Sequence, residues 1–168
     1  MSEEIPELYL VRHGIAEDHA ASGRDADRAL TRSGREKMAK AARGLEALEV
    51  APSVILTSPL VRTRETAEII ADQLGRIAIE DCDAIAPGVD HAAVARLVAK
   101  RLREGSVMLV GHEPDMSELF SFLLTGERSL QSHFKKGTVA CLSAGELPPH
   151  GLAALEWLMH SSQLAALR

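Results

Sequence analysis

Side chains that could act together on phosphorus follow three segments that we expect to be strands. Arginine binds phosphoryl oxygens in a bidentate manner, and a neutral imidazole nitrogen can attack phosphorus to form a covalent phosphohistidine. A single histidine at a strand end is more often a hydrogen-bonded turn residue, but two histidines and two arginines predict a phosphoryl-transfer site. The three segments carry Arg12-His13-Gly14, Ser58-Pro59 with Arg62, and Gly111-His112-Glu113-Pro114.

The elements that must position these residues alternate along the first two thirds of the chain. Apolar residues at helical spacing predict the helices, with Thr31 or Ser33 capping the first and Asp90 the third. We expect Ser58 to cap the second helix and Pro59 to occupy its first position. The expected strands are 7–12, 54–57, 77–80 and 107–110, and the expected helices are 31–48, 58–74 and the segment between Asp90 and Gly105; a helix over 117–124 and strand-like segments over 139–142 and 152–159 follow.

This alternation predicts an α/β fold, a single-domain three-layer α/β/α sandwich over residues 1–168 with a mostly parallel sheet. The strands should be continuously apolar, because helices cover both faces of such a sheet. The last two strand-like segments could extend or edge it. Ligands of parallel sheets bind outside the carboxyl ends of the strands, so the candidate residues should meet at one edge.

Length and composition exclude several other functions. The 168 residues are 46% hydrophobic and 26% charged, which is typical of one globular domain that needs no disulfide or structural metal. The 19 Lys and Arg against 24 Asp and Glu give a net charge of −5, which argues against nucleic acid or an anionic membrane as a partner. Cys82 and Cys141 show no metal or disulfide spacing and are expected to be core residues in a reducing compartment. Without a secretory signal or a long apolar span, we expect a cytoplasmic protein.

Several motifs occur in an order that is known from one enzyme family. They are Leu10-Val11-Arg12-His13-Gly14, Leu30-Thr31, Gly34, Ser58-Pro59, Arg62, Thr66 and Val110-Gly111-His112-Glu113-Pro114. With these motifs the chain resembles the histidine phosphatase superfamily, which has a phosphoglycerate-mutase-like fold. The resemblance extends from Leu8 to Pro114, and Lys136-Gly137 is also similar. The short length and the sequence Arg-His-Gly-x-Ala-Glu over 12–17 are most similar to bacterial phosphohistidine phosphatases of the SixA type.

The resemblance implies a role for each of the four candidate catalytic residues. His13 would be the nucleophile that becomes phosphorylated, while Arg12 and Arg62 would bind the phosphoryl oxygens. His112 would complete the phosphate-binding pocket by a hydrogen bond to the transferring group. No metal and no cofactor are implied.

A general acid is harder to identify. Larger members of the superfamily carry this carboxylic acid on an insertion after the third strand, but the segment 80–84 is not followed by a long insertion. Asp83 and Glu17 are the candidates, and the alternative for each is a solvated acid in a polar loop. A phosphoester needs such an acid because it expels an alkoxide, whereas phosphohistidine expels an imidazole, which leaves readily.

The sequence therefore favours a phosphatase that acts on phosphohistidine of a signalling protein in a phosphorelay and releases inorganic phosphate. The shortage of sequence for a lid agrees with a protein as substrate. One alternative is a phosphatase of small phosphoesters or sugar phosphates with Asp83 or Glu17 as the acid. Another is a non-catalytic phosphoprotein-binding module, although such a module would be expected to have lost one of the four residues.

Other conspicuous residues give weaker signals. The basic pair Lys135-Lys136 could attract an acidic partner or phosphate near the mouth of the site, or could be a solvated turn. Trp157 lies in an apolar segment and is expected in the core. The remaining histidines lack the spacing of a metal site and are expected at the surface or in turns: His19, His91, His133, His150 and His160.

Overall fold

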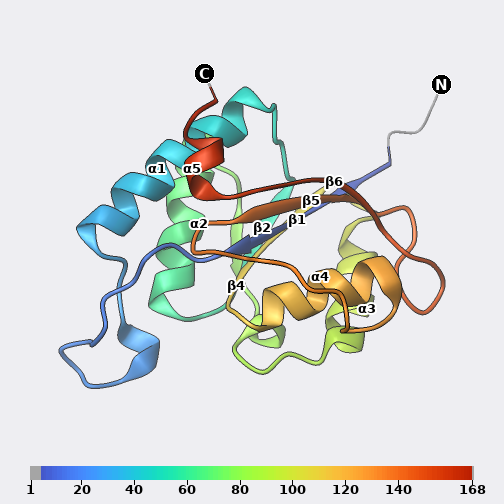
Figure 1. The fold of residues 1–168 in the computed structure, drawn as a ribbon, viewed down its shortest axis with the longest axis horizontal. Coiled ribbons are helices and arrows are strands. Elements are labelled where there is room, and N and C mark those ends of the chain that lie inside the picture. The colour runs from blue at the N-terminus through green and yellow to red at the C-terminus, as the bar shows by residue number, and fades with distance from the viewer. Residues whose placement is uncertain (1–4, 168) are drawn as a thin grey trace.

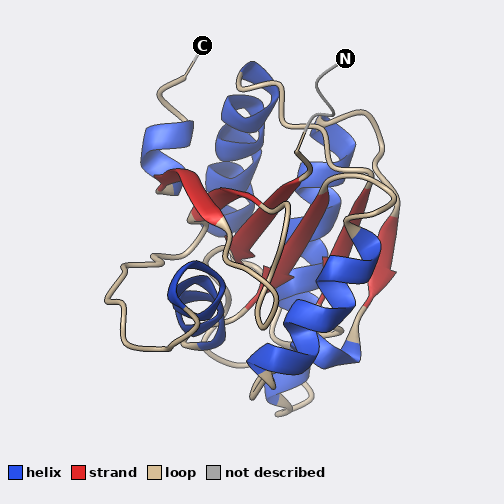
Figure 2. Cartoon of the chain, turned by 90° about the vertical axis from the view of Figure 1, so that its right-hand side faces the viewer, coloured by secondary structure: helices blue, strands red, loops and turns tan. Residues whose placement is uncertain are grey.

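A six-stranded sheet with helices on both faces makes up the part of the chain that the computed structural model describes, residues 5–167 (Figures 1 and 2). The strand order is β3-β2-β4-β1-β5-β6. The elements are β1 (Glu7–Arg12), α1 (Arg32–Ala47), β2 (Val54–Thr57), α2 (Val61–Gln73), β3 (Ile79–Asp81), α3 (His91–Arg101), β4 (Val107–Gly111), α4 (Asp115–Thr125), β5 (Val139–Ser143), β6 (Ala154–Met159) and α5 (Ser161–Leu164), with short 3-10 helices at Asp25–Asp27 and Asp83–Ile85.

The four strands β1 to β4 are parallel, β5 pairs antiparallel with β1, and β6 pairs antiparallel with β5. This topology confirms the predicted mostly parallel sheet, and the last two strands extend it. Arg12 is opposite Gly111 and Thr57 is opposite Val110. The carboxyl ends of β1, β4 and β2 are therefore level with one another, so the residues that follow them are neighbours.

Alternate residues of the central strands enter two separate cores. Leu8 and Leu10 pack on the side of α3 and α4, whereas Tyr9 and Val11 pack on the side of α1, α2 and α5 (Figure 1). This burial on both faces explains why β1, β2 and β4 have continuously apolar sequences. No helix among residues 5–167 is long and apolar enough to cross a membrane.

The edge strands differ from the expectation of continuously apolar strands. β3 covers 79–81 instead of 77–80, and its Glu80 and Asp81 are exposed and form ion pairs with Arg101 and Arg64. β6 is exposed over its first half, and its pairing with β5 is interrupted by a bulge at Glu156. Both strands have a neighbour on only one side, so apolar residues are not needed on every face.

The start of the second helix also differs from the prediction. α2 begins at Val61 with Leu60 as the N-cap residue, not at Ser58 and Pro59. The amide of Ser58 donates to the carbonyl of Val110 at 3.0 Å, which prolongs the β2–β4 pairing by one residue. Ser58 is thus held to the sheet and is not free to cap the helix. Thr31 and Asp90 do cap α1 and α3 as predicted, by accepting from the amides of Gly34 and Ala93.

Helix α5 packs directly on α1 in the same layer (Figure 1). Gly44 of α1 allows this approach, because a Cβ atom at that position would lie 2.1 Å from the carbonyl oxygen of Leu164. Cys141 is buried in the adjacent core and Cys82 is partly buried in the opposite one, both as free thiols. Trp157 is only half-buried against this core, so the prediction that it is a core residue is confirmed only in part.

Candidate active site

Two histidines lie side by side at the carboxyl edge of the sheet. His13 directly follows β1 and His112 directly follows β4, and these strands are neighbours. Their ring centroids are 5.3 Å apart with an angle of 60° between the planes. The residues are 7% and 4% exposed, so a group held between them would be largely removed from bulk water.

His13 is a neutral imidazole in a defined tautomer. Burial lowers its pKa from 6.5 to about 4, and the charges of Arg62, Arg12 and Lys136 contribute to this lowering, while the hydrogen bond to Gly14 opposes it. Its Nδ1 lies 2.7 Å from the carbonyl oxygen of Gly14, which can only accept, so Nδ1 carries the proton. The lone pair is therefore on Nε2, and this nitrogen can act as a nucleophile at neutral pH.

His112 is also neutral. Its pKa is lowered from 6.5 to about 3, mainly by burial, and the neighbouring His13 and Arg62 contribute to this lowering. Its Nε2 is 2.7 Å from Oγ of Ser58, the residue that prolongs the β2–β4 pairing. When the hydroxyl of Ser58 donates to Nε2, the proton of His112 lies on Nδ1, where it is available to an oxygen of a ligand.

Both arginines are held by backbone carbonyl groups. Nη1 of Arg12 donates to the carbonyl of Phe134 at 2.8 Å, and Nη1 of Arg62 donates to the carbonyl of Asp25 at 3.0 Å. Arg62 is 6% exposed, and it lies in the first turn of α2 as predicted. The two guanidinium groups lower the pKa values of both histidines, which places their positive charge at the same edge of the sheet.

Asp25 is a residue of this site that the sequence analysis did not identify. Its Oδ2 accepts a hydrogen bond of 3.1 Å from Nη2 of Arg62, and Arg28 forms a second, longer ion pair with its Oδ1. Asp25 belongs to a 3-10 helix in the loop between β1 and α1, 37 residues away from Arg62. No local pattern marks such an acid, because its role depends on a contact between distant segments.

Three polar atoms of the site are buried and have no partner among residues 5–167: Nε of Arg12, Nε of Arg62 and Nδ1 of His112. A buried donor without a partner costs about 1–3 kcal/mol, so such groups are usually satisfied by a ligand or water. All three belong to side chains that can donate hydrogen bonds, and two of them are cations. The natural complement is a small, multiply charged anion that accepts several hydrogen bonds, such as a phosphoryl group.

Thr66 connects the loop of the nucleophile to α2. Its Oγ1 accepts from the amide of Gly14 at 3.1 Å and donates to the carbonyl of Arg62 at 2.8 Å. The residue after His13 and the backbone of Arg62 are thereby fixed relative to each other. The side chain is fully buried, so this link is protected from water.

The two candidate acids are not joined to the site. Glu17 and Asp83 are exposed, and no hydrogen bond or ion pair among residues 5–167 links either side chain to His13, His112 or the arginines. Asp25 does contact the site, where its carboxylate accepts from Arg62 and pairs with Arg28.

No group of three or more potential metal ligands occurs among residues 5–167. His19, His133 and His150 are exposed, and His160 is half-buried at the start of α5. His91 corrects the expectation of a surface or turn position. It is the first residue of α3 and is buried, with its Nε2 3.6 Å from a carboxylate oxygen of Glu118.

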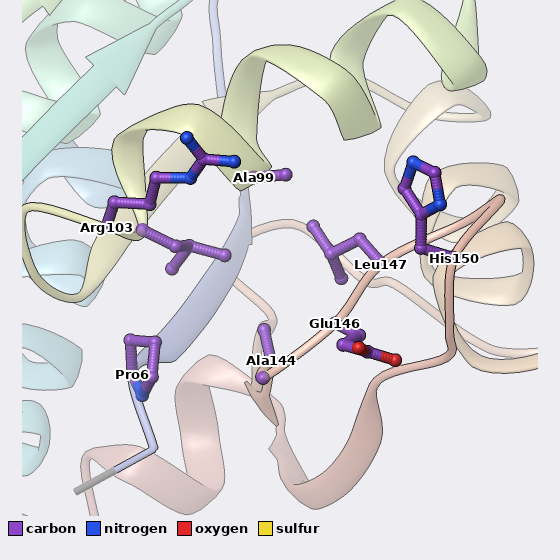
Figure 3. Close-up of a pocket in the computed structure, with 9 residues that line it drawn as sticks. Pro6, Ala99, Arg103, Ala144, Glu146, Leu147 and His150 are labelled. Carbon is purple, nitrogen blue, oxygen red and sulfur yellow. The ribbon is translucent and has the colours of Figure 1, made fainter. Parts of the chain in front are cut away.

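A cavity of about 460 Å³ lies at the opposite edge of the sheet, away from the two histidines (Figure 3). Pro6, just before β1, and Ala144, just after β5, line it together with Ala99 and Arg103 from α3 and its C-terminal end. The six residues of β1 separate this cavity from His13 by about 20 Å, at 3.3 Å per residue. It is therefore not part of the site described above.

A family model and two known proteins match the sequence of this chain. Residues 8–86 match the model of the histidine phosphatase superfamily (branch 1). An uncharacterised protein of the cyanobacterium Picosynechococcus is 34% identical over 142 residues, 83% of this chain and 86% of the relative. The phosphohistidine phosphatase SixA of Escherichia coli is 27% identical over 161 residues, 94% of this chain and 96% of the relative.

The fold of the chain is also similar to a solved structure. The structure of the protein histidine phosphatase SixA complexed with tungstate superposes with a TM-score of 0.83 at 26% identity. The similarity covers 94% of this chain and 99% of that chain.

Proposed function

This chain belongs to the histidine phosphatase superfamily and is a phosphatase, and from that membership we propose that it removes phosphate from phosphorylated histidine on a protein. The observation that carries the proposal is a neutral His13, whose Nε2 is free to attack, in a site where, among residues 5–167, Glu17 and Asp83 form no hydrogen bond or ion pair with the catalytic residues and Asp25 is paired with Arg62. The relatives named phosphohistidine phosphatase and protein histidine phosphatase support the same substrate class.

In the first step, the lone pair on Nε2 of His13 attacks phosphorus and the bond between phosphorus and the substrate imidazole breaks. Arg12 and Arg62 bind the phosphoryl oxygens, and Nδ1–H of His112 donates to the same group. The electron pair of the broken bond returns to the substrate imidazole, and the other ring nitrogen of that imidazole carries a proton. The substrate therefore leaves as a neutral imidazole.

In the second step, a water molecule attacks the phosphorus of phosphorylated His13. The bond between phosphorus and Nε2 breaks, its electron pair returns to Nε2, and the proton of the water passes to solvent. Orthophosphate is released and the neutral imidazole is restored. Because burial and the two arginines hold the pKa of His13 at about 4, the released nitrogen stays unprotonated and ready for another cycle.

The leaving group is the reason for preferring phosphohistidine to a phosphoester. An alkoxide needs a proton from a general acid, and such help is worth about 10²- to 10⁴-fold in rate. Glu17 and Asp83 are exposed and lie apart from the hydrogen bonds of the site, and Asp25 is ion-paired. An imidazole leaves without that help, so this geometry suits the P–N bond better than the P–O bond.

The test is turnover of a phosphohistidine-bearing protein domain compared with a panel of small phosphoesters and sugar phosphates. We expect a higher kcat/KM for the phosphohistidine protein, and a loss of at least about 10³-fold in His13→Ala because the nucleophile is removed. His133→Ala, a substitution at an exposed histidine, is the matched control and should keep full activity.

The covalent intermediate should be trapped in the same experiment with ³²P-labelled substrate. An alkaline denaturing quench is needed because the P–N bond hydrolyses in acid. Label on the wild-type enzyme that is missing from His13→Ala would support the two-step path. Faster turnover of an ester than of phosphohistidine would contradict the proposal and make Asp83 and Glu17 the next residues to substitute.

A further inference from the structure

A cavity of about 420 Å³ lies next to the candidate active site, on the side of α1 and α5. Arg12 and Gly14, the two neighbours of His13 in the sequence, line it. Three lysines also line it: Lys37 from α1 and Lys135 and Lys136 from the segment before β5. The cavity therefore combines a position beside the nucleophile with a concentration of positive charge.

The lysine segment is attached to the backbone of the nucleophile. The amide of Gly137 is 3.1 Å from the carbonyl oxygens of both Arg12 and His13 and donates to them. Gly137 has a φ of 77°, a left-handed conformation that favours glycine, and this turn brings Lys136 beside the site. The charge of Lys136 is one of the causes of the lowered pKa of His13, which is consistent with that position.

The lysines of the cavity are not neutralised by acidic side chains of the protein. Every ion pair among residues 5–167 uses an arginine or a histidine, and none uses a lysine. All three lysines are exposed. The chain has a net charge of −5. The three unpaired lysines therefore give the cavity a positive charge, opposite in sign to that of the whole molecule.

The less exposed part of the lining, which forms the floor of the cavity, is apolar. Ile15 and Met38 line it, together with Gly34 at the start of α1. An aspartate or glutamate side chain fits this combination, because its methylene groups can contact the floor while its carboxylate reaches the lysines at the rim.

We propose that this cavity, lined by Lys37, Lys135 and Lys136, binds acidic side chains of the substrate protein next to its phosphohistidine. This inference rests on the proposed function. It adds a specificity-determining surface to the site, since a phosphohistidine without acidic neighbours would gain nothing from the lysines. Exposed charges act mainly on encounter and orientation, so their contribution should decrease as salt screens them.

The test is a charge-reversal variant, Lys37→Glu/Lys135→Glu, assayed on a phosphohistidine protein with acidic residues around the histidine and on free phosphohistidine. We expect kcat/KM for the protein to fall about ten-fold more than kcat/KM for free phosphohistidine, since two attractive contacts become repulsive. Added salt should lower kcat/KM of the wild-type enzyme for the protein and should no longer do so in the variant, because the cavity no longer attracts acidic residues.

Lys40→Glu/Lys100→Glu is the matched control. It changes the net charge by the same amount, and its positions on α1 and α3 are exposed and do not line the cavity. We expect its ratio of protein to free-phosphohistidine turnover to equal that of the wild type. An equal ratio in Lys37→Glu/Lys135→Glu would overturn the docking surface.

Three outcomes distinguish a failure of this inference from a failure of the proposed function. If the cavity variant loses both activities equally, the lysines act on the phosphoryl group itself and the docking surface is wrong. If the wild-type enzyme turns over neither phosphohistidine substrate but hydrolyses esters, the proposed function fails first, and the docking surface fails with it. Wild-type turnover with an unchanged ratio in the variant leaves the function intact and removes only the docking surface.

Discussion

The positive charges around His13 have two roles. In the proposed function they bind phosphoryl oxygens, and they also lower the pKa of the imidazole, although burial lowers it most. A protonated imidazole would have no lone pair on Nε2, so the groups that bind the substrate also keep the nucleophile reactive. A site made of histidine and arginine therefore needs no separate base to activate its nucleophile.

Asp25 is expected to position the guanidinium group of Arg62. Removal of the carboxylate in Asp25→Ala leaves Nη2 of a buried guanidinium without its acceptor, and we expect kcat/KM for phosphohistidine protein to fall about 5- to 30-fold. Asp25→Asn keeps an acceptor oxygen and should lose less. Asp27→Ala is the control, because Asp27 lies in the same 3-10 helix but pairs with the exposed Arg24.

The inhibition constant of inorganic phosphate should rise in Asp25→Ala, since Arg62 would no longer be held in place for the anion. A merely structural role would instead lower the free energy of unfolding and leave phosphate binding unchanged. Equal behaviour of Asp25→Ala and Asp27→Ala in both measurements would contradict a positioning role.

Sequence reasoning was effective for residues that follow strands and ineffective for residues in loops. Arg12, His13 and His112 are fixed by the ends of β1 and β4, so predicting the strands was enough to bring them together. Asp25 and its contact with Arg62 depend on the path of the loop before α1, which no periodic pattern encodes.

The contact between α1 and α5 depends on the absence of a side chain at Gly44. In Gly44→Ala the new Cβ would meet the carbonyl of Leu164, and backbone cannot move aside as a flexible side chain can. Overpacking of this kind costs about 1–3 kcal/mol, and the better helix propensity of alanine offsets only about 1 kcal/mol. We therefore expect a net loss of up to about 2 kcal/mol in the free energy of unfolding.

Urea unfolding measures this loss, and hydrogen exchange should show weaker protection in α5. Lys40→Ala is the control, since Lys40 is exposed on the same helix and its substitution should change stability by less than about 0.5 kcal/mol. Unchanged stability and unchanged exchange in Gly44→Ala would show that α5 does not depend on this approach.

Element boundaries could be predicted where local signals act alone. Thr31 and Asp90 cap their helices as expected, because nothing else binds their side chains more strongly. Ser58 does not, since its amide pairs with Val110 and its hydroxyl with His112. These tertiary contacts override the local preference of Ser-Pro for a helix start, and they are invisible in the sequence around residue 58.

For the whole molecule, the two neutral histidines predict a dependence of stability on pH. Their pKa values in the folded state, about 4 and about 3, lie below the unfolded value of 6.5. Between these values the unfolded chain binds more protons than the folded chain, so stability is complete above pH 6.5 and decreases as the pH falls. One pKa unit corresponds to about 1.4 kcal/mol, so we expect a loss of roughly 2–4 kcal/mol between pH 7 and pH 5.

Urea unfolding across this pH range measures the loss. His112→Asn removes one of the two groups, so its free energy of unfolding should depend on pH about half as steeply as that of the wild type. The slope is the diagnostic quantity, because the substitution can also change stability at every pH. Equal slopes in the two proteins would show that His112 takes up its proton equally in the folded and unfolded states.

The overall architecture was predictable because alternating strands and helices leave few ways to bury the apolar strands. The order of the strands was not, since alternation alone does not decide on which side of β1 each later strand is added. Only the structure shows that β3 and β6 are the edge strands. An edge position explains why both strands have exposed residues, although buried strands were expected.

The two edges of the sheet have a consequence for the behaviour of the protein at high concentration. An edge strand offers unpaired backbone groups to other molecules and can start aggregation. β3 is three residues long and carries the ion pairs of Glu80 and Asp81, and β6 is interrupted by the bulge at Glu156. Neither edge provides a long, flat template, so concentrated solutions should resist the growth of intermolecular sheets.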